Sequence, residues 1–343
     1  MPKVIFDKRN VLVTGGAGFI GSHLCDELVK ECKVICIDNF VTSSATNIEH
    51  LLPNSNFVFI NHNISEPLDL ETLPELKKFK IPFQGIQEIY HLACPTSPRH
   101  FEENCYETLL ANSLGIKNAL DYAVKYGAKF LHFSSSVVYG PKNLNPNVGN
   151  IKEDYLGHLD HLSKRACYDE GKRFAETMVS DYRRLFNVNT KIMRIFRTYG
   201  PRMPLQDDQM IPDFVVNALN NEDLVILGDE NFSSSFCYVT DAVDAAFKLM
   251  NSSLTGPINI GSDEDVKLSD VCQTIIEEAG ATNSKIIFKE RTLFMSELPL
   301  PDIFQAKNEL GWMPVVTLKN GLKKTIFDLQ AKKQLKGLAY NGQ

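Results

Sequence analysis

The sequence lacks the features of a membrane or nucleic-acid-binding protein. Its 343 residues contain no run of about 18 uncharged apolar residues, the usual requirement of a membrane-spanning helix, so we expect no membrane partner. No charged-then-apolar leader ending in small residues is present, so we expect no signal peptide and a cytoplasmic location. The formal charge is −6 and no basic block stands out, so nucleic acid is not an expected partner.

Metal-binding patterns are also absent from the sequence. The eight cysteines form no paired CxxC motif, and several of them lie within apolar strand or helix patterns. We therefore expect reduced, mostly buried thiols and no metal site. The content of 43% hydrophobic and 23% charged residues is typical of a globular chain, and its length suffices for a large core arranged in two lobes.

A glycine-rich turn near the start of the chain predicts a dinucleotide site. Residues 9–14 are typical of a short buried strand, which runs into Gly15, Gly18 and Gly21 and then into a helical pattern at residues 22–30. The first glycine permits a tight turn, the second permits close approach of a pyrophosphate, and the third permits close packing of helix on strand. The helix N-terminus then faces the phosphates with free N–H groups.

An acidic residue follows the second predicted strand. This strand covers residues 33–37 and ends in Asp38, 23 residues after Gly15. A carboxylate at this place accepts hydrogen bonds from the ribose hydroxyls of adenosine and repels a 2′-phosphate. The sequence therefore predicts NAD, rather than NADP, as the cofactor.

Apolar strand-like runs alternate with helical patterns along the first two thirds of the chain. This alternation is typical of an α/β fold with a doubly wound parallel sheet of the Rossmann type. Four further strands are predicted at residues 57–61, 88–93, 129–136 and 190–196, and helices are predicted at residues 106–126 and 167–185.

The regular alternation ends after Gly200, where proline and acidic residues follow. We predict an NAD-binding Rossmann domain made of residues 1–199 and 236–262. A smaller α/β substrate-binding lobe would consist of residues 200–235 and 263–343.

Tyr168 and Lys172 are the strongest candidates for catalysis. Their spacing of four places a phenol and an ammonium on one face of the predicted helix, one turn apart. A phenol has a pKa near 10, so it becomes a useful base near neutral pH only when a cation stabilises the phenolate. Such a tyrosine can take the proton of an alcohol while hydride leaves the carbon.

These motifs occur in an order that resembles a known family. Besides the glycine turn and the Tyr168–Lys172 pair, the sequence contains His91-Leu-Ala-Cys-Pro-Thr-Ser-Pro, Ser134-Ser-Ser-Val-Val-Tyr-Gly and Arg194-Ile-Phe-Arg-Thr-Tyr-Gly-Pro-Arg-Met. The chain is similar over nearly its whole length to extended short-chain dehydrogenases/reductases of the NAD-dependent epimerase/dehydratase family. Within that family it looks most like the UDP-glucuronate decarboxylases.

The resemblance implies roles for individual residues and a nucleotide sugar as the substrate. Ser135 would hold the reacting sugar oxygen, and Asn112 would support Lys172. The implied cofactor residues are Gly15, Gly18, Phe19, Ile20, Gly21, Asp38, Asn39, Leu92, Ala93, Asn112, Tyr168 and Lys172. The implied substrate residues are Pro95, Ser97, Arg99, Ser136, Arg197 and Arg202. Relatives usually form homodimers through the helix after residue 104 and the Tyr168 helix.

Several positions depart from the decarboxylase pattern. Val137 stands where the decarboxylases carry a glutamate, Pro299 and Ser234 stand where they carry arginines, and Arg197 replaces an asparagine. Arginine binds carboxylates and phosphates with a bidentate fork, so these losses are not neutral. We expect slow or no decarboxylation of UDP-glucuronate. Arg99 and Arg197 are either relocated anion-binding groups or ordinary surface arginines.

The sequence thus predicts an NAD-dependent enzyme that oxidises a nucleotide sugar transiently at C4. The residues leave three alternatives open for the product. It can form by decarboxylation, by 4-epimerisation, or by release of the keto sugar. An NAD-binding relative without catalysis is a further alternative, because the glutamate and arginines named above are missing. The retained Ser135, Tyr168 and Lys172 favour an enzyme.

Overall fold

The chain folds around a seven-stranded sheet in which every pairing is parallel. The computed structural model describes residues 8–97, 102–145, 149–205, 209–290 and 298–336. The strand order is β11-β6-β5-β4-β1-β2-β3, which is the doubly wound order with the first strand near the middle. The strands are β1 (Asn10–Thr14), β2 (Lys33–Asp38), β3 (Phe57–Asn61), β4 (Glu88–His91), β5 (Lys129–Ser135), β6 (Thr190–Ile195) and β11 (Pro257–Ile260).

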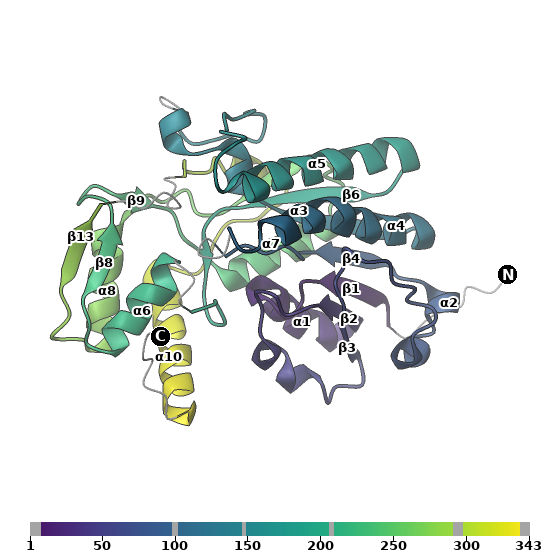
Figure 1. The fold of residues 1–343 in the computed structure, drawn as a ribbon, viewed down its shortest axis with the longest axis horizontal. Coiled ribbons are helices and arrows are strands. Elements are labelled where there is room, and N and C mark those ends of the chain that lie inside the picture. Colours follow the sequence, from purple (N-terminus) through teal and green to yellow (C-terminus); the bar gives the residue numbers. More distant parts are fainter. Residues whose placement is uncertain (1–7, 98–101, 146–148, 206–208, 291–297, 337–343) are drawn as a thin grey trace.

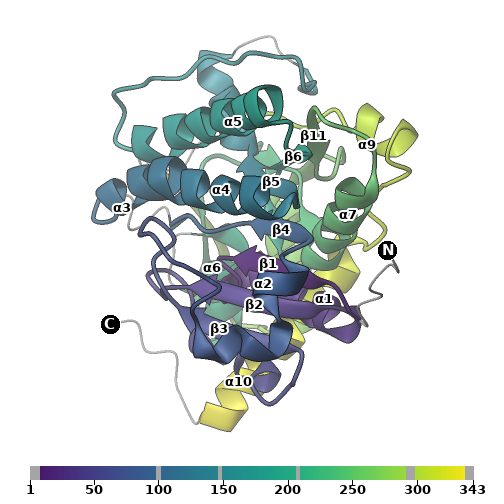
Figure 2. The same ribbon diagram turned by 90° about the vertical axis from the view of Figure 1, so that its right-hand side faces the viewer.

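Helices cover both faces of this sheet, as Figure 2 shows. On one face lie α3 (Cys105–Leu110), α4 (Ile116–Tyr126) and α5 (Ala166–Phe186). On the other face lie α1 (Phe19–Glu31) and α7 (Val239–Asn251). Each face has its own apolar core, so the strands are buried on both sides and read as continuous apolar runs.

The predicted Rossmann fold is therefore confirmed, with two differences in its elements. The strand β11 was not predicted, because it is only four residues long, begins with a proline and lies at the edge of the sheet beside β6. The helix predicted at residues 106–126 is interrupted by a π-helical stretch, Ala111–Gly115, between α3 and α4. The six predicted strands are all present with ends that shift by no more than two residues.

A smaller group of elements packs beside the sheet, at the left of Figure 1. It contains α6 (Met210–Leu219), α8 (Leu268–Ala279), α10 (Leu318–Lys336) and the parallel pair β8 (Leu224–Leu227) and β13 (Ile286–Lys289). These elements share an apolar core that also includes Tyr199, Tyr238 and Val239. The exact boundaries of the substrate-binding lobe stay a prediction.

Short elements complete the described structure. They are α2 (Ile81–Gln84), α9 (Phe304–Asn308), β7 (Thr198–Tyr199), β9 (Ser233–Ser234), β10 (Cys237–Tyr238) and β12 (Val266–Lys267). Within the described ranges, none of the helices combines the length and the apolar character that crossing a membrane requires.

The contact between Gly21 and the glycine turn generates a prediction about stability. A Cβ atom at Gly21 would lie 2.2 Å from the Gly15 carbonyl oxygen and 2.8 Å from the Gly16 Cα. We expect Gly21→Ala to lower the free energy of unfolding in urea by about 1–3 kcal/mol or more, because α1 must move away from β1. Gly256→Ala is the matched control, since a Cβ there meets no atom within 4 Å. An equal decrease in the free energy of unfolding in the two variants would contradict this account.

Candidate active site

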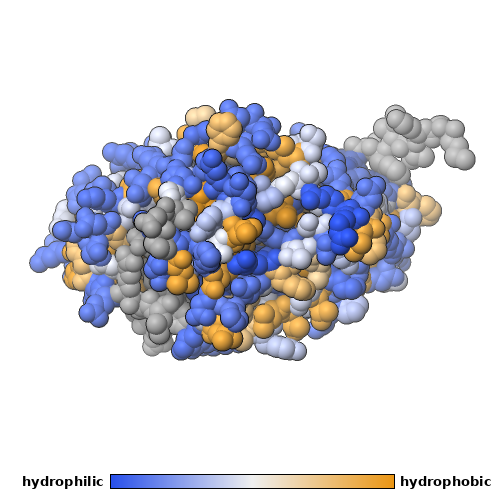
Figure 3. All heavy atoms as spheres, turned by 90° about the horizontal axis from the view of Figure 1, so that it is seen from above, coloured by the Kyte–Doolittle hydropathy of each residue, from blue (hydrophilic) through white to orange (hydrophobic). Residues whose placement is uncertain are grey.

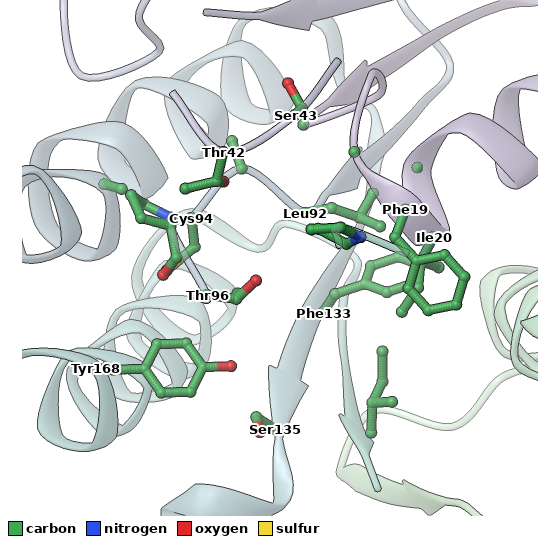
Figure 4. A pocket seen from close by; sticks show the side chains of 18 of the residues that line it. Phe19, Ile20, Thr42, Ser43, Leu92, Cys94, Thr96, Phe133, Ser135 and Tyr168 are labelled. Atoms are coloured by element: carbon green, nitrogen blue, oxygen red, sulfur yellow. The ribbon is translucent and has the colours of Figure 1, made fainter. Parts of the chain in front are cut away.

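A cavity of about 390 Å³ lies where the strands of the sheet end. The carboxyl ends of parallel strands meet at one edge, so the segments that follow β1, β2, β4 and β5 all reach this cavity. The residues after β6, the start of α5 and part of α6 complete the lining. Figure 4 shows a close view, in which the hydroxyl group of Tyr168 points toward the end of the strand that carries Ser135.

Tyr168, Lys172 and Ser135 come together in this cavity from two elements. Tyr168 lies in the first turn of α5, and Lys172 follows one turn later on the same face. Ser135 is the last residue of β5, and its side chain shares a hydrogen bond with the phenol of Tyr168. The Lys172 ammonium lies 5.9 Å from the centroid of the Tyr168 ring. The spacing of four in the sequence therefore gives the expected geometry.

Burial raises the pKa of Tyr168 well above its usual value, and the nearby Cys94 thiol adds to the increase. The hydrogen bond with Ser135 acts in the opposite direction, because it stabilises the phenolate. The phenol alone is therefore a poor base at neutral pH. It needs additional positive charge to release its proton. The Arg165 guanidinium lowers the pKa of Tyr168, and the Lys172 ammonium lies on the same helix face, 5.9 Å from the centroid of the ring.

Lys172 is held in place by the strand next to it. Only 3% of the residue is exposed, and Nζ donates a hydrogen bond of 2.9 Å to the carbonyl oxygen of Phe133 in β5. The Asn112 amide, which the resemblance assigns to supporting Lys172, donates instead to the carbonyl oxygen of Thr108 and to the Sγ of Cys94. Asn112 lies in the π-helical stretch and is not part of the cavity lining.

The glycine turn fits the pyrophosphate of a dinucleotide. Gly15 has a φ of 73° and packs so closely on the segment after β4 that a Cβ atom would lie 2.7 Å from the Ala93 nitrogen. Gly18 lines the cavity, and a Cβ there would meet only the Gly15 carbonyl oxygen at 3.2 Å. α1 begins directly after Gly18, so its free N–H groups face the cavity.

The Asp38 carboxylate is oriented by three donors. Oδ2 accepts from the Ala17 N–H at 3.0 Å, and Oδ1 accepts from the Phe40 N–H at 3.0 Å and from the Ser43 hydroxyl at 2.7 Å. Asp38 lines the cavity at the end of β2, and only 8% of it is exposed. A carboxylate fixed in this way fits the ribose hydroxyls of NAD. The residues present therefore fit this cofactor.

Most of the residues predicted for the site line this one cavity, and three do not. The lining residues are Gly15, Gly18, Phe19, Ile20, Gly21, Asp38, Asn39, Leu92, Ala93, Pro95, Ser135, Ser136, Tyr168, Lys172 and Arg197. Asn112 and the buried Ser97 lie outside the lining, and Arg202 forms an ion pair of 2.8 Å with Asp26 of α1 instead. Arg99 lies outside the described residues. The roles of these residues stay predictions.

Several residues that line the cavity were not predicted from the sequence. Residues 62–65 directly follow β3, and the rule that ligands bind at the carboxyl ends of strands could have found them. Arg165 also lines the cavity, where its guanidinium binds the Asp169 carboxylate one turn further along the helix. Among the described residues, no group of three His, Cys, Asp or Glu side chains is arranged to hold a metal ion.

The surroundings of the Tyr168 ring are apolar. Val137 and Tyr168 are buried against each other, and Cys94, Cys167 and Leu298 pack around them. The departure noted in the sequence at Val137 thus places a hydrocarbon group directly against the phenol ring. The polar groups beside the ring include the phenol oxygen of Tyr168 itself and the hydroxyl of Ser135.

Comparisons with known sequences identify relatives over nearly the whole chain. A model of the NAD dependent epimerase/dehydratase family matches residues 11–261. UDP-glucuronic acid decarboxylase 1 of Danio rerio is 39% identical over 93% of this chain and 72% of its own length. UDP-glucuronic acid decarboxylase 4 of Arabidopsis thaliana is 40% identical over 95% of this chain and 70% of its own length.

Solved structures agree with this assignment. UDP-glucuronic acid 4-epimerase from Bacillus cereus, in complex with UDP-glucuronic acid and NAD, is 28% identical with a TM-score of 0.80, covering 94% of this chain and 99% of that one. UDP-glucose 4-epimerase from Thermotoga maritima, with UDP-glucose, is 26% identical with a TM-score of 0.81 over the same shares. Sequence, fold and site geometry lead to one conclusion: this chain is an enzyme of the NAD-dependent epimerase/dehydratase family, and NAD is its cofactor.

Proposed function

We propose that this enzyme oxidises a nucleotide sugar transiently at C4 of the sugar. The observation that carries the proposal is the convergence of Ser135, Tyr168 and Lys172 in the same cavity as the glycine turn and Asp38. The relatives that are named as acting on or binding UDP-glucuronic acid and UDP-glucose support a nucleotide sugar as the substrate class.

Each residue of the site has a separate role in the proposed reaction. Ser135 holds the C4 oxygen by hydrogen bonding, and Tyr168 as phenolate takes the hydroxyl proton. Lys172 stabilises the phenolate by its charge, while its bond to the Phe133 carbonyl keeps the ammonium in place. NAD, when bound, supplies the capacity to accept a hydride from the sugar carbon and to return it. The apolar contacts of Val137 and Leu298 exclude water from one side of the Tyr168 ring.

Three outcomes are open to a C4 ketone. A β-keto acid loses CO₂ if C6 is a carboxylate, return of hydride to the other face gives an epimer, and release gives a keto sugar. The decarboxylase relatives favour the first outcome. Val137 and Pro299 stand where the resemblance places a glutamate and an arginine, so we propose another nucleotide sugar as a better substrate than UDP-glucuronate, with Arg197 binding an anionic group.

Mass spectrometry of reactions with UDP-, GDP-, CDP- and TDP-sugars tests the proposal. Loss of about 44 mass units indicates release of one CO₂, and a product of unchanged mass with altered chromatographic retention indicates an epimer. A keto sugar is lighter by about two mass units. If none of these sugars is converted while NAD binds, the alternative of an NAD-binding relative without catalysis holds instead.

We also propose a homodimer in the cytoplasm. Large apolar side chains are exposed on α3, on the π-helical stretch and on α5, including Tyr106 at 66% and Phe174 at 51%. Figure 3 views the molecule from the side of α5 and shows apolar residues among polar ones. A second copy packing on these helices would bury them. All eight cysteines are free thiols, which fits a reducing compartment.

The position of Tyr168 generates a prediction about turnover. Tyr168→Phe removes only the oxygen that accepts the proton, so we expect NAD affinity to change little while kcat falls about a hundredfold or more. Tyr182→Phe is the matched control on the same helix, because it removes a hydroxyl that bonds to Asp121. Retention of more than about a tenth of the activity in Tyr168→Phe would require a different base.

The charge of Lys172 generates a prediction about pH dependence. Removing a cation destabilises the phenolate and raises the pKa of Tyr168 further, so the base becomes available only at higher pH. We expect Lys172→Met to move the rising limb of the pH profile of kcat upward by about 1–3 pH units, or to abolish activity. Lys117→Met, which loses an exposed ion pair with Asp121, is the control. An unshifted profile in an active Lys172→Met enzyme contradicts the role assigned to the ammonium.

Asp38 generates a prediction about the cofactor. Asp38→Arg loses the acceptor for the ribose hydroxyls and adds a charge that attracts a 2′-phosphate. Each lost charged hydrogen bond is worth roughly 1.5–3 kcal/mol, so we expect NAD affinity to fall about tenfold or more and the preference over NADP to disappear. Calorimetric titration with both cofactors measures this. The idea is wrong if the unaltered protein binds NADP more tightly than NAD.

A further inference from the structure

A network of largely buried polar groups lies beside the cavity, around α5 and the strands β5, β6 and β11. We call it the Arg194 network, and it consists of Ser134, Tyr139, Glu153, Glu176, Arg194 and Asn259. None of these six residues lines the cavity except Ser134, and the reaction proposed above uses none of them.

The first half of the network joins the catalytic helix to the strands. Glu176 lies one turn after Lys172 in α5, and its carboxylate accepts a hydrogen bond of 2.5 Å from the Ser134 hydroxyl. Arg194 of β6 donates to the same carboxylate with Nε at 2.9 Å and Nη2 at 2.7 Å. Because Ser134 precedes Ser135 in β5, these bonds set the position of α5 along the strand that holds Ser135.

The second half joins the same arginine to the last strand of the sheet. Arg194 Nη1 donates to the Tyr139 hydroxyl at 2.7 Å and to the Glu153 carbonyl oxygen at 2.8 Å. The Tyr139 hydroxyl in turn donates to Asn259 Oδ1 at 2.7 Å. The backbone N–H of Asn259 donates to Glu153 Oε1 at 2.9 Å. Tyr139 ends the 3₁₀ turn that begins directly after Ser135. The bonds of this half therefore also constrain the position of Ser135.

Asn259 extends the network to a wall of the cavity. Its Nδ2 donates to the carbonyl oxygens of Ile151 at 2.8 Å and of Asp302 at 3.2 Å. Ile151 and the segment 300–302 are joined by two backbone hydrogen bonds of 2.8 Å. Leu298, two residues before this segment, lines the cavity and packs beside Tyr168 and Val137. Asn259 therefore holds the segment that follows Leu298 in this wall of the cavity.

The energetics of the network point to positioning more than to stability. The side chains of Arg194 and Glu176 are each only 12% exposed, and burying an ion pair costs desolvation that the attraction between the charges roughly offsets. A planar guanidinium with donors to Glu176, Tyr139 and Glu153 instead fixes distances and angles among three segments. Alignment errors of about 1 Å at a reaction centre reduce rates by about a hundredfold.

We propose that Arg194 and Asn259 are positioning residues for the reaction, each with a separate effect. Arg194 holds the Tyr168 helix in register with Ser135, and Asn259 holds the Leu298 wall against the Tyr168 ring. The proposal rests on the proposed function, because it concerns the geometry of the same site.

The kinetic test compares two variants with a matched control. Arg194→Lys keeps the charge but loses the planar guanidinium fork, so we expect kcat to fall about 10–100-fold. KM for the sugar and the affinity for NAD should stay within about threefold of the values of the unaltered protein. Asn259→Ala releases the wall, so we expect KM for the sugar to rise at least about fivefold with kcat less affected. Arg9→Lys alters another arginine–glutamate pair, between Arg9 and Glu88 at the opposite end of the strands, and leaves both parameters unchanged.

Hydrogen exchange provides a second measurement that does not depend on turnover. The Ile151 and Asp302 amides are bonded to the segment that Asn259 holds, so their exchange should accelerate at least about tenfold in Asn259→Ala and not in Arg9→Lys. If the unaltered protein converts no sugar, the proposed function fails, and this measurement still tests whether Asn259 holds the wall. Unchanged exchange overturns the assignment of Asn259. A parallel loss of kcat, sugar affinity and NAD affinity in Arg194→Lys shows a merely structural role and overturns the assignment of Arg194.

Discussion

The buried ammonium of Lys172 is the interaction on which the site depends most. A charged amine that is only 3% exposed must be hydrogen-bonded, and the Phe133 carbonyl of β5 accepts its proton at 2.9 Å. This bond joins the middle of α5 to the strand that ends in Ser135. It also fixes the ammonium near the Tyr168 ring. Ser135, Tyr168 and Lys172, the three groups proposed to carry out the reaction, are therefore tied together by α5 and β5, so that a shift of α5 would separate them.

The cofactor half of the site follows from a different constraint, the close contact of neighbouring strand ends. Gly15 lies against the backbone of Leu92 and Ala93 with no room for a Cβ atom, so the glycine turn and the segment after β4 occupy one edge. The Asp38 carboxylate bonds to the Ala17 N–H and thereby ties the end of β2 to the same turn. These three strand ends would hold the dinucleotide, and they line the same cavity as Tyr168 and Lys172 of α5.

Much of this arrangement is readable from the sequence, because it depends on local patterns. Apolar runs mark strands that are buried on both faces, and the spacing of Tyr168 and Lys172 marks a helix face. The remainder depends on partners that lie far away in the chain. The family resemblance implies that Arg202 contacts the substrate, but its guanidinium forms an ion pair with Asp26 of α1. β11 begins with a proline at the edge of the sheet, and its parallel pairing with β6 defines it.

The active site combines an apolar cavity wall with a polar network behind it. Val137 and Leu298 surround the phenol ring with hydrocarbon, which raises the pKa of Tyr168 and makes its proton transfer dependent on a nearby cation. An apolar wall provides no directional bonds, so it cannot hold its own position. The hydrogen bonds of Asn259 supply that direction from the other side of the segment. The hydrogen bonds that hold this wall therefore come from a residue outside the cavity lining.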